Sequence, residues 1–94
     1  MTVAVFPLLS NKDELKKKAR EVYDIVRCYD AFYDESGSIG KRYARMDEAG
    51  CPFCFTVDGD TLKDQTVTVR YRDTGAQERI GIDRVVAFLD ERLR

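Results

Sequence analysis

The sequence predicts an α/β domain in which one mixed, five-stranded sheet has helices packed on its faces. In the first half of the chain, short apolar segments alternate with longer segments whose apolar residues recur every three or four positions. This β-α alternation implies parallel strands joined by right-handed crossovers. After Val57, strand-like segments follow one another across short turns, which implies antiparallel pairing. The predicted order is β-α-β-α-β-β-β-α, within a single domain over residues 1–94.

The first strand and the first helix are predicted from their apolar patterns. A nearly continuous apolar run predicts a buried strand over Val3–Leu9. A long amphipathic helix is predicted over Lys12–Tyr29, with Asn11 as its N-cap and Glu14 completing a capping box. The apolar face of this helix consists of Leu15, Ala19, Val22, Val26 and Tyr29. A short second strand is predicted at Ala31–Asp34.

The middle of the chain is predicted to form a turn, a second helix and a third strand. The turn is expected at Ser36–Gly40 and the helix at about Ile39–Ala49, where Gly50 suits the C-terminus of a helix. Pro52 prevents this helix from continuing. Alternating side chains then predict a strand over Phe53–Val57.

The last third of the chain is predicted to form two further strands and a last helix. A turn at Asp58–Asp60 precedes a strand over Thr66–Arg72, in which apolar and polar side chains alternate. The chain then turns at Asp73–Gly75 into a fifth strand over Gln77–Ile82. Asp83 is expected to cap the last helix. The buried residues of that helix are expected to be Val85, Val86, Leu89 and Leu93.

The composition argues against several function classes. Sixteen basic and 17 acidic residues leave a net charge of −1, so the domain lacks the overall basic footprint of a generic nucleic-acid binder. There is no histidine, which removes the usual general base, and we predict no catalytic residue. Three cysteines, no secretory signature and no segment of transmembrane length indicate a cytoplasmic protein with free thiols and no membrane contact.

Two short motifs invite a chemical interpretation that their context does not favour. Cys51 and Cys54 form a C-x-x-C at the start of a predicted strand, where residues three apart point to opposite faces. We therefore expect the two sulfurs to diverge and to serve as packing groups, and we predict no metal site. The glycines of Gly37–Gly40 lack the spacing of a phosphate-binding loop and follow a strand, so a plain turn is expected.

The segment Asp34–Gly50 is the strongest candidate for a function. Spacing alone leaves two interpretations open: a surface ion pair between Arg45 and Glu48, or a surface that binds unstacked RNA bases. RNA bases are bound by aromatic or guanidinium stacking together with hydrogen bonds to their edges, and a carboxylate can accept from the amine of cytosine. The candidate RNA-binding residues are Lys41, Arg42, Tyr43, Arg45, Asp47, Glu48, Arg70 and Arg72.

Several stretches of the chain are similar to one family. They are V-A-V-F-P-L at Val3–Leu8, S-G-S-I-G-K-R-Y-A-R-M-D-E-A-G at Ser36–Gly50, P-F-C-F-T-V-D at Pro52–Asp58, T-V-T-V-R-Y-R-D at Thr66–Asp73 and I-D-R-V-V-A-F-L at Ile82–Leu89. In these stretches the chain resembles the C-terminal anticodon-binding domain of the dimeric, α2-type glycyl-tRNA synthetase, a class II aminoacyl-tRNA synthetase. One departure is that Arg72 and Asp73 are followed by Thr74, where the family has serine.

This resemblance implies a three-layer α/β/α domain with a five-stranded mixed sheet and three helices. It also implies binding to the anticodon loop of glycine tRNA, whose second and third anticodon bases are both cytosine. In that case Asp47 or Glu48 would meet the amine, and Arg42 or Arg45 the carbonyl and ring nitrogen. The implied partners are the tRNA and the catalytic domain of the synthetase, whose parent enzyme is a homodimer.

The catalytic domain is absent from these 94 residues, so ATP and glycine have no site here and no cofactor is expected in this domain. We expect no catalytic activity from the chain alone. Two alternative functions remain open at this point. The same fold serves as a protein docking or dimerisation module in a mitochondrial DNA polymerase accessory subunit. A thiol-disulfide oxidoreductase that uses Cys51 and Cys54 is the other alternative.

Overall fold

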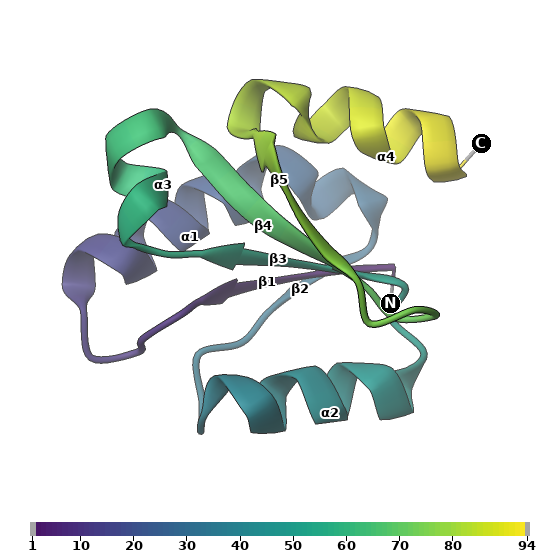
Figure 1. Ribbon diagram of the computed structural model, residues 1–94, viewed down its shortest axis with the longest axis horizontal. Helices are drawn as coiled ribbons and strands as arrows, with labels where there is room; N and C mark the ends of the chain where they lie inside the picture. Colours follow the sequence, from purple (N-terminus) through teal and green to yellow (C-terminus); the bar gives the residue numbers. More distant parts are fainter. Residues whose placement is uncertain (1, 94) are drawn as a thin grey trace.

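The computed structural model describes residues 2–93, which are organised around a five-stranded sheet in the order β2-β1-β3-β4-β5 (Figure 1). The strands are β1 (Val3–Pro7), β2 (Ala31–Tyr33), β3 (Phe53–Val57), β4 (Thr66–Tyr71) and β5 (Gln77–Gly81). β1 pairs in parallel with β2 and β3, whereas β4 pairs antiparallel with β3 and with β5. The predicted mixed sheet is confirmed.

Helices lie on both faces of this sheet, which gives the predicted three-layer architecture (Figure 1). The helices are α1 (Asp13–Val26), α2 (Ile39–Ala49), α3 (Gly59–Asp64) and α4 (Val85–Leu93). Two short 3-10 helices, η1 (Arg27–Tyr29) and η2 (Ile82–Arg84), precede β2 and α4. α1 and α4 cover one face, and α2 covers part of the other. Within residues 2–93, no helix is both long and apolar enough to cross a membrane.

The larger hydrophobic core lies between the sheet and the two helices α1 and α4. Alternate residues of the three central strands point into it, because successive side chains of a strand face opposite sides. The fully buried strand residues of this core are Val3, Val5, Phe55, Val57, Val67 and Val69. The helices contribute Leu15, Ala19, Val22, Val26, Val85, Phe88 and Leu89. The prediction that Val86 and Leu93 are buried is wrong, because they are 41% and 38% exposed, and Phe88 packs into the core from α4 instead.

A second, smaller core lies beneath α2. It consists of Ala4, Phe6, Met46, Cys51 and Cys54, with Ile39 and Tyr43 packed against it. β1 thus buries side chains on both of its faces, which explains why its sequence is a continuous apolar run rather than an alternating one. In the described residues, this cluster takes no member from β4 or β5, so α2 covers only part of its face of the sheet.

The short helix α3 is absent from the sequence-based prediction, which places only a turn at Asp58–Asp60. Its start is fixed by a capping box in which the Asp58 carboxylate accepts from the Thr61 N–H at 3.1 Å. In return, the Asp58 N–H donates to the Thr61 hydroxyl at 3.0 Å. Six residues are too few to show an apolar helical period, so this helix follows from its cap and not from a pattern.

Two predicted helix caps differ from the structure. α1 begins at Asp13 with Lys12 as its N-cap, which makes no side-chain capping hydrogen bond, so the expected capping box at Asn11 does not form. Before α4, Asp83 lies inside η2 and does not occupy a cap position. Both helices are instead held by their buried faces, because packing outweighs a cap worth about 1 kcal/mol.

Candidate nucleic-acid interface

α2 is positioned by caps at both of its ends. The Ser38 hydroxyl accepts from the Lys41 N–H at 3.3 Å at the start of the helix. At its end, Gly50 adopts the left-handed conformation with φ of 77° and donates its N–H to carbonyls of the last turn. The helix therefore has fixed ends, and it lies across β1 and β3 with residues 42, 43 and 46 toward the sheet.

Arg42 is buried, contrary to the expectation that it contacts a base. Its side chain is 1% exposed, and Nη1 donates to the carbonyl of Pro7 at 2.6 Å. Nη1 and Nη2 also donate to the carbonyls of Asp34 at 3.4 Å and Leu8 at 3.3 Å. Burial lowers the pKa of Arg42 from its ordinary value. Arg42 thus ties α2 to the ends of β1 and β2 and is not part of the exposed surface.

Arg45 is exposed, and it braces the loop that precedes α2. Its Nη2 donates to Asp34 Oδ2 and to the carbonyl of Ser36, both at 2.7 Å. Burial raises the pKa of Asp34, but hydrogen bonds from Ser36 and Arg45 outweigh burial and lower the net pKa. The ion-pair partner of Arg45 is therefore Asp34, eleven residues earlier, whereas Glu48 lies exposed on α2.

The structure brings Arg70 of β4 together with Tyr43 and Asp47 of α2. Arg70 donates to both Asp47 oxygens, at 2.9 and 3.3 Å, and its guanidinium carbon lies 4.8 Å from the centroid of the Tyr43 ring. The Tyr43 hydroxyl bonds the Thr56 hydroxyl at 2.6 Å, and its ring meets Phe6 edge-on. The Asp47 hydrogen bonds raise the pKa of Arg70. Three of the predicted residues thus form one ordered cluster.

The remaining candidates lie farther out on the surface. Lys41 and Glu48 are exposed on α2. Arg72 follows β4, is 42% exposed and pairs with Asp73 at 3.2 Å. This exposure permits contact with a phosphate backbone, although a surface ion pair of this kind adds little to stability.

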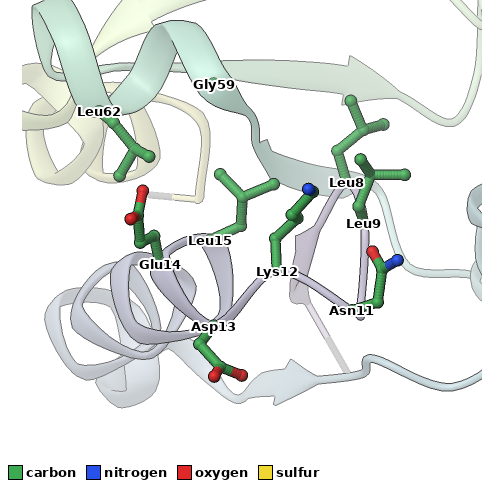
Figure 2. Close-up of a pocket in the computed structure, with 9 residues that line it drawn as sticks. All are labelled: Leu8, Leu9, Asn11, Lys12, Asp13, Glu14, Leu15, Gly59 and Leu62. Atoms are coloured by element: carbon green, nitrogen blue, oxygen red, sulfur yellow. The ribbon is translucent and has the colours of Figure 1, made fainter.

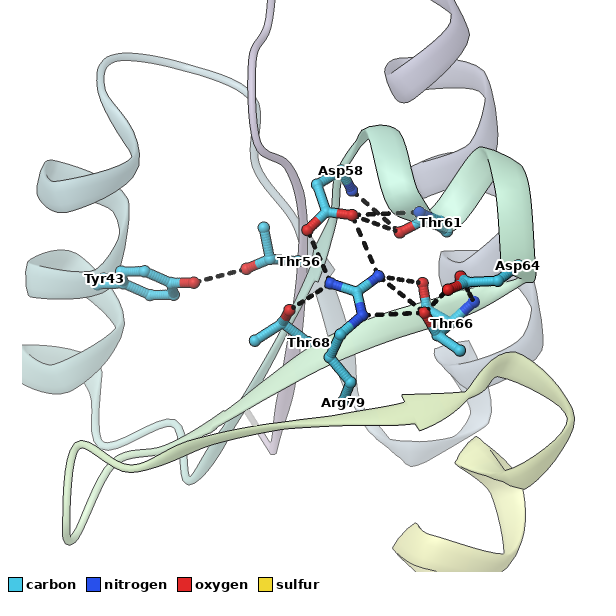
Figure 3. A network of polar contacts seen from close by, with 8 residues as sticks. All are labelled: Tyr43, Thr56, Asp58, Thr61, Asp64, Thr66, Thr68 and Arg79. Carbon is cyan, nitrogen blue, oxygen red and sulfur yellow. Dashed lines mark hydrogen bonds and ion pairs between the residues drawn. The ribbon is translucent and has the colours of Figure 1, made fainter.

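Arg79 of β5, which no sequence motif indicates, lies on the same side of the sheet as Arg70. It donates to both oxygens of Asp58, at 2.9 and 3.2 Å, and to the hydroxyls of Thr66 and Thr68 (Figure 3). Burial raises the pKa of Asp58, but the hydrogen bonds from Arg79 and Thr61 lower it overall. The alternation of β5 puts Arg79 on this face, but only the pairing with β4 shows what lies beside it.

Residues 2–92 match the family model described as "Anticodon binding domain". The chain belongs to this family. This anticodon binding domain is 20% identical to the solved RNA-binding domain of threonyl-tRNA synthetase from Cryptosporidium parvum. The TM-score is 0.83, and the match covers 96% of this chain and 23% of that one. Prolyl-tRNA synthetase from the same organism gives 20% identity and a TM-score of 0.83 over 99% of this chain and 20% of that one, so both share the fold.

Curated relatives of this anticodon binding domain are more similar in sequence. The chain is 50% identical over 92 residues to glycine–tRNA ligase of Rhodopirellula baltica, covering 97% of this chain and 17% of that protein. It is 53% identical over 92 residues to glycine–tRNA ligase of Methanocaldococcus jannaschii, covering 96% of this chain and 16% of that protein. The chain therefore spans about a sixth of the length of these relatives.

A hollow of about 510 Å³ lies elsewhere on the anticodon binding domain, where β1 ends and α1 begins (Figure 2). Leu8, Leu9 and Leu62 line it and are exposed. Residues 11–15, at and just before the start of α1, and Gly59 of α3 complete the lining, and none of the predicted RNA contacts borders the hollow. Its lining combines leucines with the charged Lys12, Asp13 and Glu14, whereas the surface beside α2 is rich in guanidinium groups.

The two cysteines of the C-x-x-C lie together, contrary to the expectation that their sulfurs diverge. Cys51 precedes the first residue of β3, so the alternation of a strand does not govern its direction. The Cys51 thiol donates to the carbonyl of Phe53 at 3.4 Å. The nearby Cys54 thiol lowers the pKa of Cys51, whereas Cys51 and burial together raise the pKa of Cys54. Both are at most 1% exposed, which limits thiol exchange with a substrate. Within residues 2–93, no group of three or more potential ligand side chains is placed to hold a metal ion.

Proposed function

We propose that this chain is the anticodon-recognition domain of a glycine–tRNA ligase and binds the anticodon loop of glycine tRNA. The observation that supports this most strongly is the identity of 50% and 53% to glycine–tRNA ligases over nearly the whole chain. The solved threonyl- and prolyl-tRNA synthetases share the fold at 20% identity. Within the family, the glycine enzymes are therefore the nearer relatives, and glycine tRNA is the RNA to test.

The cluster of Tyr43, Asp47 and Arg70 suits recognition of cytosine. Asp47 is 40% exposed, and its ionised carboxylate has more acceptor sites than the two that Arg70 occupies. It can accept from the exocyclic amine of cytosine while Arg70 holds it in place. Arg45, at 44% exposure, lies on the same helix and can donate to the carbonyl or ring nitrogen of a base. Lys41 and Arg72 are proposed to contact phosphates.

We assign substrate binding and catalysis to the parts of a glycine–tRNA ligase that this chain does not cover. The relatives are about six times longer, so binding of ATP and glycine and the ligase reaction belong to the remainder. The catalytic domain is then an intramolecular partner, and the enzyme is proposed to act as a homodimer in the cytoplasm, where translation occurs.

Titration of two RNA stem-loops against the chain tests this function. One carries the glycine anticodon, and in the other a single cytosine of the second or third anticodon position is replaced by uracil. Uracil has a carbonyl where cytosine has an amine, so the replacement removes the hydrogen bond to a carboxylate and should cost about 1–3 kcal/mol of binding free energy. Equal affinity for both RNAs would contradict base-specific recognition.

A matched variant locates the contact on the protein. Asp47→Asn should reduce the discrimination between the two RNAs at one of the two positions, because the amide no longer offers two equivalent acceptors. Glu91→Gln, on α4 at the other face of the sheet, should leave the discrimination unchanged.

A further inference from the structure

A polar surface on the open part of the sheet lies beside the cluster formed by α2 and Arg70. In the sheet register, Thr56 of β3 lies opposite Thr68 of β4, which in turn lies opposite Arg79 of β5. The α2 end of this row is occupied by Tyr43, whose hydroxyl bonds Thr56 (Figure 3). Arg79 forms the other end, on the edge strand that the second core does not reach.

Every N–H group of the Arg79 side chain is used within the protein. Nε donates to the Thr66 hydroxyl at 3.0 Å. Nη1 donates to Asp58 at 2.9 Å and to the Thr68 hydroxyl at 3.1 Å. Nη2 donates to Asp58 at 3.2 Å and to Thr66 at its hydroxyl, 2.8 Å, and carbonyl, 3.2 Å. A guanidinium has five N–H donors, all in its plane, so these contacts leave none for a ligand.

The acceptors around Arg79 are themselves held in place. The Thr66 hydroxyl donates its proton to Asp64 at 2.6 Å, which leaves its lone pairs for Arg79 (Figure 3). Asp58 also accepts from the N–H and the hydroxyl of Thr61 in the cap of α3. The Arg79 guanidinium is therefore fixed in one orientation. The conformational entropy of its side chain is lost during folding, so little more is lost when a ligand binds.

Arg79 nevertheless remains accessible, with 35% of its side-chain surface exposed, compared with 21% for Asp58. Because its N–H edges face protein acceptors, the flat face of the guanidinium and the aliphatic stem are the parts of Arg79 that remain for a ligand to contact. A phosphate is a poor ligand for this group, since a phosphate oxygen needs an N–H donor and would meet the Asp58 carboxylate. A flat, unsaturated group is a good ligand, because guanidinium planes stack on aromatic rings and bases.

We propose that Arg79 is a stacking platform for an unpaired base of the bound RNA loop. This inference rests on the proposed function and adds a subsite to it. Stacking does not depend on the base edge, so the platform orders a base without selecting its identity. In β5, Gln77 lies opposite Arg70, which makes Arg70 and Arg79 diagonal neighbours on one face, about 7–8 Å apart at the backbone. One loop can therefore contact both the platform and the cluster that contacts cytosine.

The test combines a conservative variant with RNAs that lack one base. Arg79→Lys keeps the charge and removes the plane, and Arg84→Lys is the matched control at an exposed arginine of η2. The RNAs are the glycine anticodon stem-loop and versions with a single abasic site at each loop position. Arg79→Lys should weaken binding of the intact loop about 5-fold or more, as expected for the loss of one stacked base. Arg84→Lys should have no effect.

At one loop position, the abasic RNA should bind wild type and Arg79→Lys with equal affinity. The missing base and the Arg79→Lys substitution would each remove the same stacking contact, so their effects should not add. The proposal is overturned if Arg79→Lys binds the intact loop as tightly as wild type. It is also overturned if the loss is the same for every abasic RNA, because Arg79 would then act only through structure or charge.

A measurement on the wild-type protein covers the case in which Arg79→Lys fails to fold. Binding of the RNA should shift the Arg79 Nε–H proton resonance upfield, because a base stacked over the guanidinium places this proton in its ring current. Removal of the base at one loop position should abolish this upfield shift. If the shift persists with every abasic RNA, the stacking platform is overturned.

The same measurements distinguish failure of the platform from failure of the proposed function. An equal affinity of wild type for the glycine loop and for a loop with an unrelated anticodon contradicts glycine recognition. The comparison of wild type with Arg79→Lys still decides the platform, because stacking tolerates any base. An absence of binding to both loops overturns both proposals.

Discussion

At the scale of single residues, Arg42 shows how a buried cation can serve a fold without meeting a ligand. The parallel strands β1 and β2 end side by side, and the carbonyls of Pro7, Leu8 and Asp34 near their ends point toward one place. Buried carbonyls need donors, and one guanidinium supplies several in a fixed fork. The desolvation of Arg42, which lowers its pKa, is the cost of this arrangement.

Replacement of Arg42 by methionine tests this role. Arg42→Met keeps an unbranched side chain but leaves buried carbonyls of Pro7 and its neighbours without donors, so it should lower the free energy of unfolding by roughly 1–3 kcal/mol or more. Urea denaturation measures the difference. Arg84→Met, at an exposed position in η2, should change stability by no more than about 0.5 kcal/mol. An Arg42→Met protein as stable as wild type would show that these hydrogen bonds are dispensable.

At the scale of elements, α2 has one glycine in its first turn, Gly40, and another at its C-terminal cap, Gly50. Gly50 has φ of 77°, where an L side chain is strained, and a Cβ there would meet no atom within 4 Å. Gly40 lies in the first turn of α2, and a Cβ there would likewise meet nothing. The two glycines therefore differ in backbone conformation and not in available space.

Alanine substitutions at these two glycines should change stability in opposite directions. Gly50→Ala should destabilise the chain by about 1–2 kcal/mol, because the left-handed conformation is strained for a residue with a Cβ. Gly40→Ala should stabilise it by about 0.5–1 kcal/mol, because alanine loses less backbone entropy in a helix. Thermal unfolding of both variants measures the effect. A loss of stability in Gly40→Ala would mean that another constraint acts at this turn.

The helices and strands that the sequence could predict are those with an apolar pattern sustained over several residues or with a residue that ends the element. α2 has the predicted bounds because an apolar face and Gly50 define it, and β3 has the predicted bounds because Pro52 and an alternating pattern define it. α3 has neither signal. Its start depends on reciprocal hydrogen bonds of Asp58 and Thr61, which a sequence pattern does not distinguish from a turn.

The candidate site was less predictable than the fold. Arg42 and Met46 are four residues apart on the buried face of α2, but an arginine is normally assigned to solvent, so the pattern does not indicate its burial. Arg79 belongs to an edge strand of mostly exposed residues, and its role depends on Asp58, 21 residues away in sequence. Such partners follow from strand order and register, which periodicity does not supply.

At the scale of the whole molecule, a net charge of −1 means that any RNA must be bound by a local surface. Much of the positive charge near α2 is already paired with carboxylates. The pairs are Arg45 with Asp34, Arg70 with Asp47 and Arg79 with Asp58. Lys41 and Arg72 are exposed and are the proposed phosphate contacts, although Arg72 also forms a surface ion pair with Asp73. The interface should therefore depend on base contacts more than on counterion release.

The salt dependence of RNA binding tests this balance. Each phosphate contacted in a single strand contributes about −0.7 to the slope of log affinity against log salt, so contacts from Lys41 and Arg72 predict a slope near −1.4. Lys41→Gln and Arg72→Gln should each reduce its magnitude by about 0.7. Lys17→Gln, on α1 at the opposite face of the sheet, should leave it unchanged. A slope several times steeper than −1.4, unaltered by either variant, would instead indicate that a broad cationic surface binds the RNA.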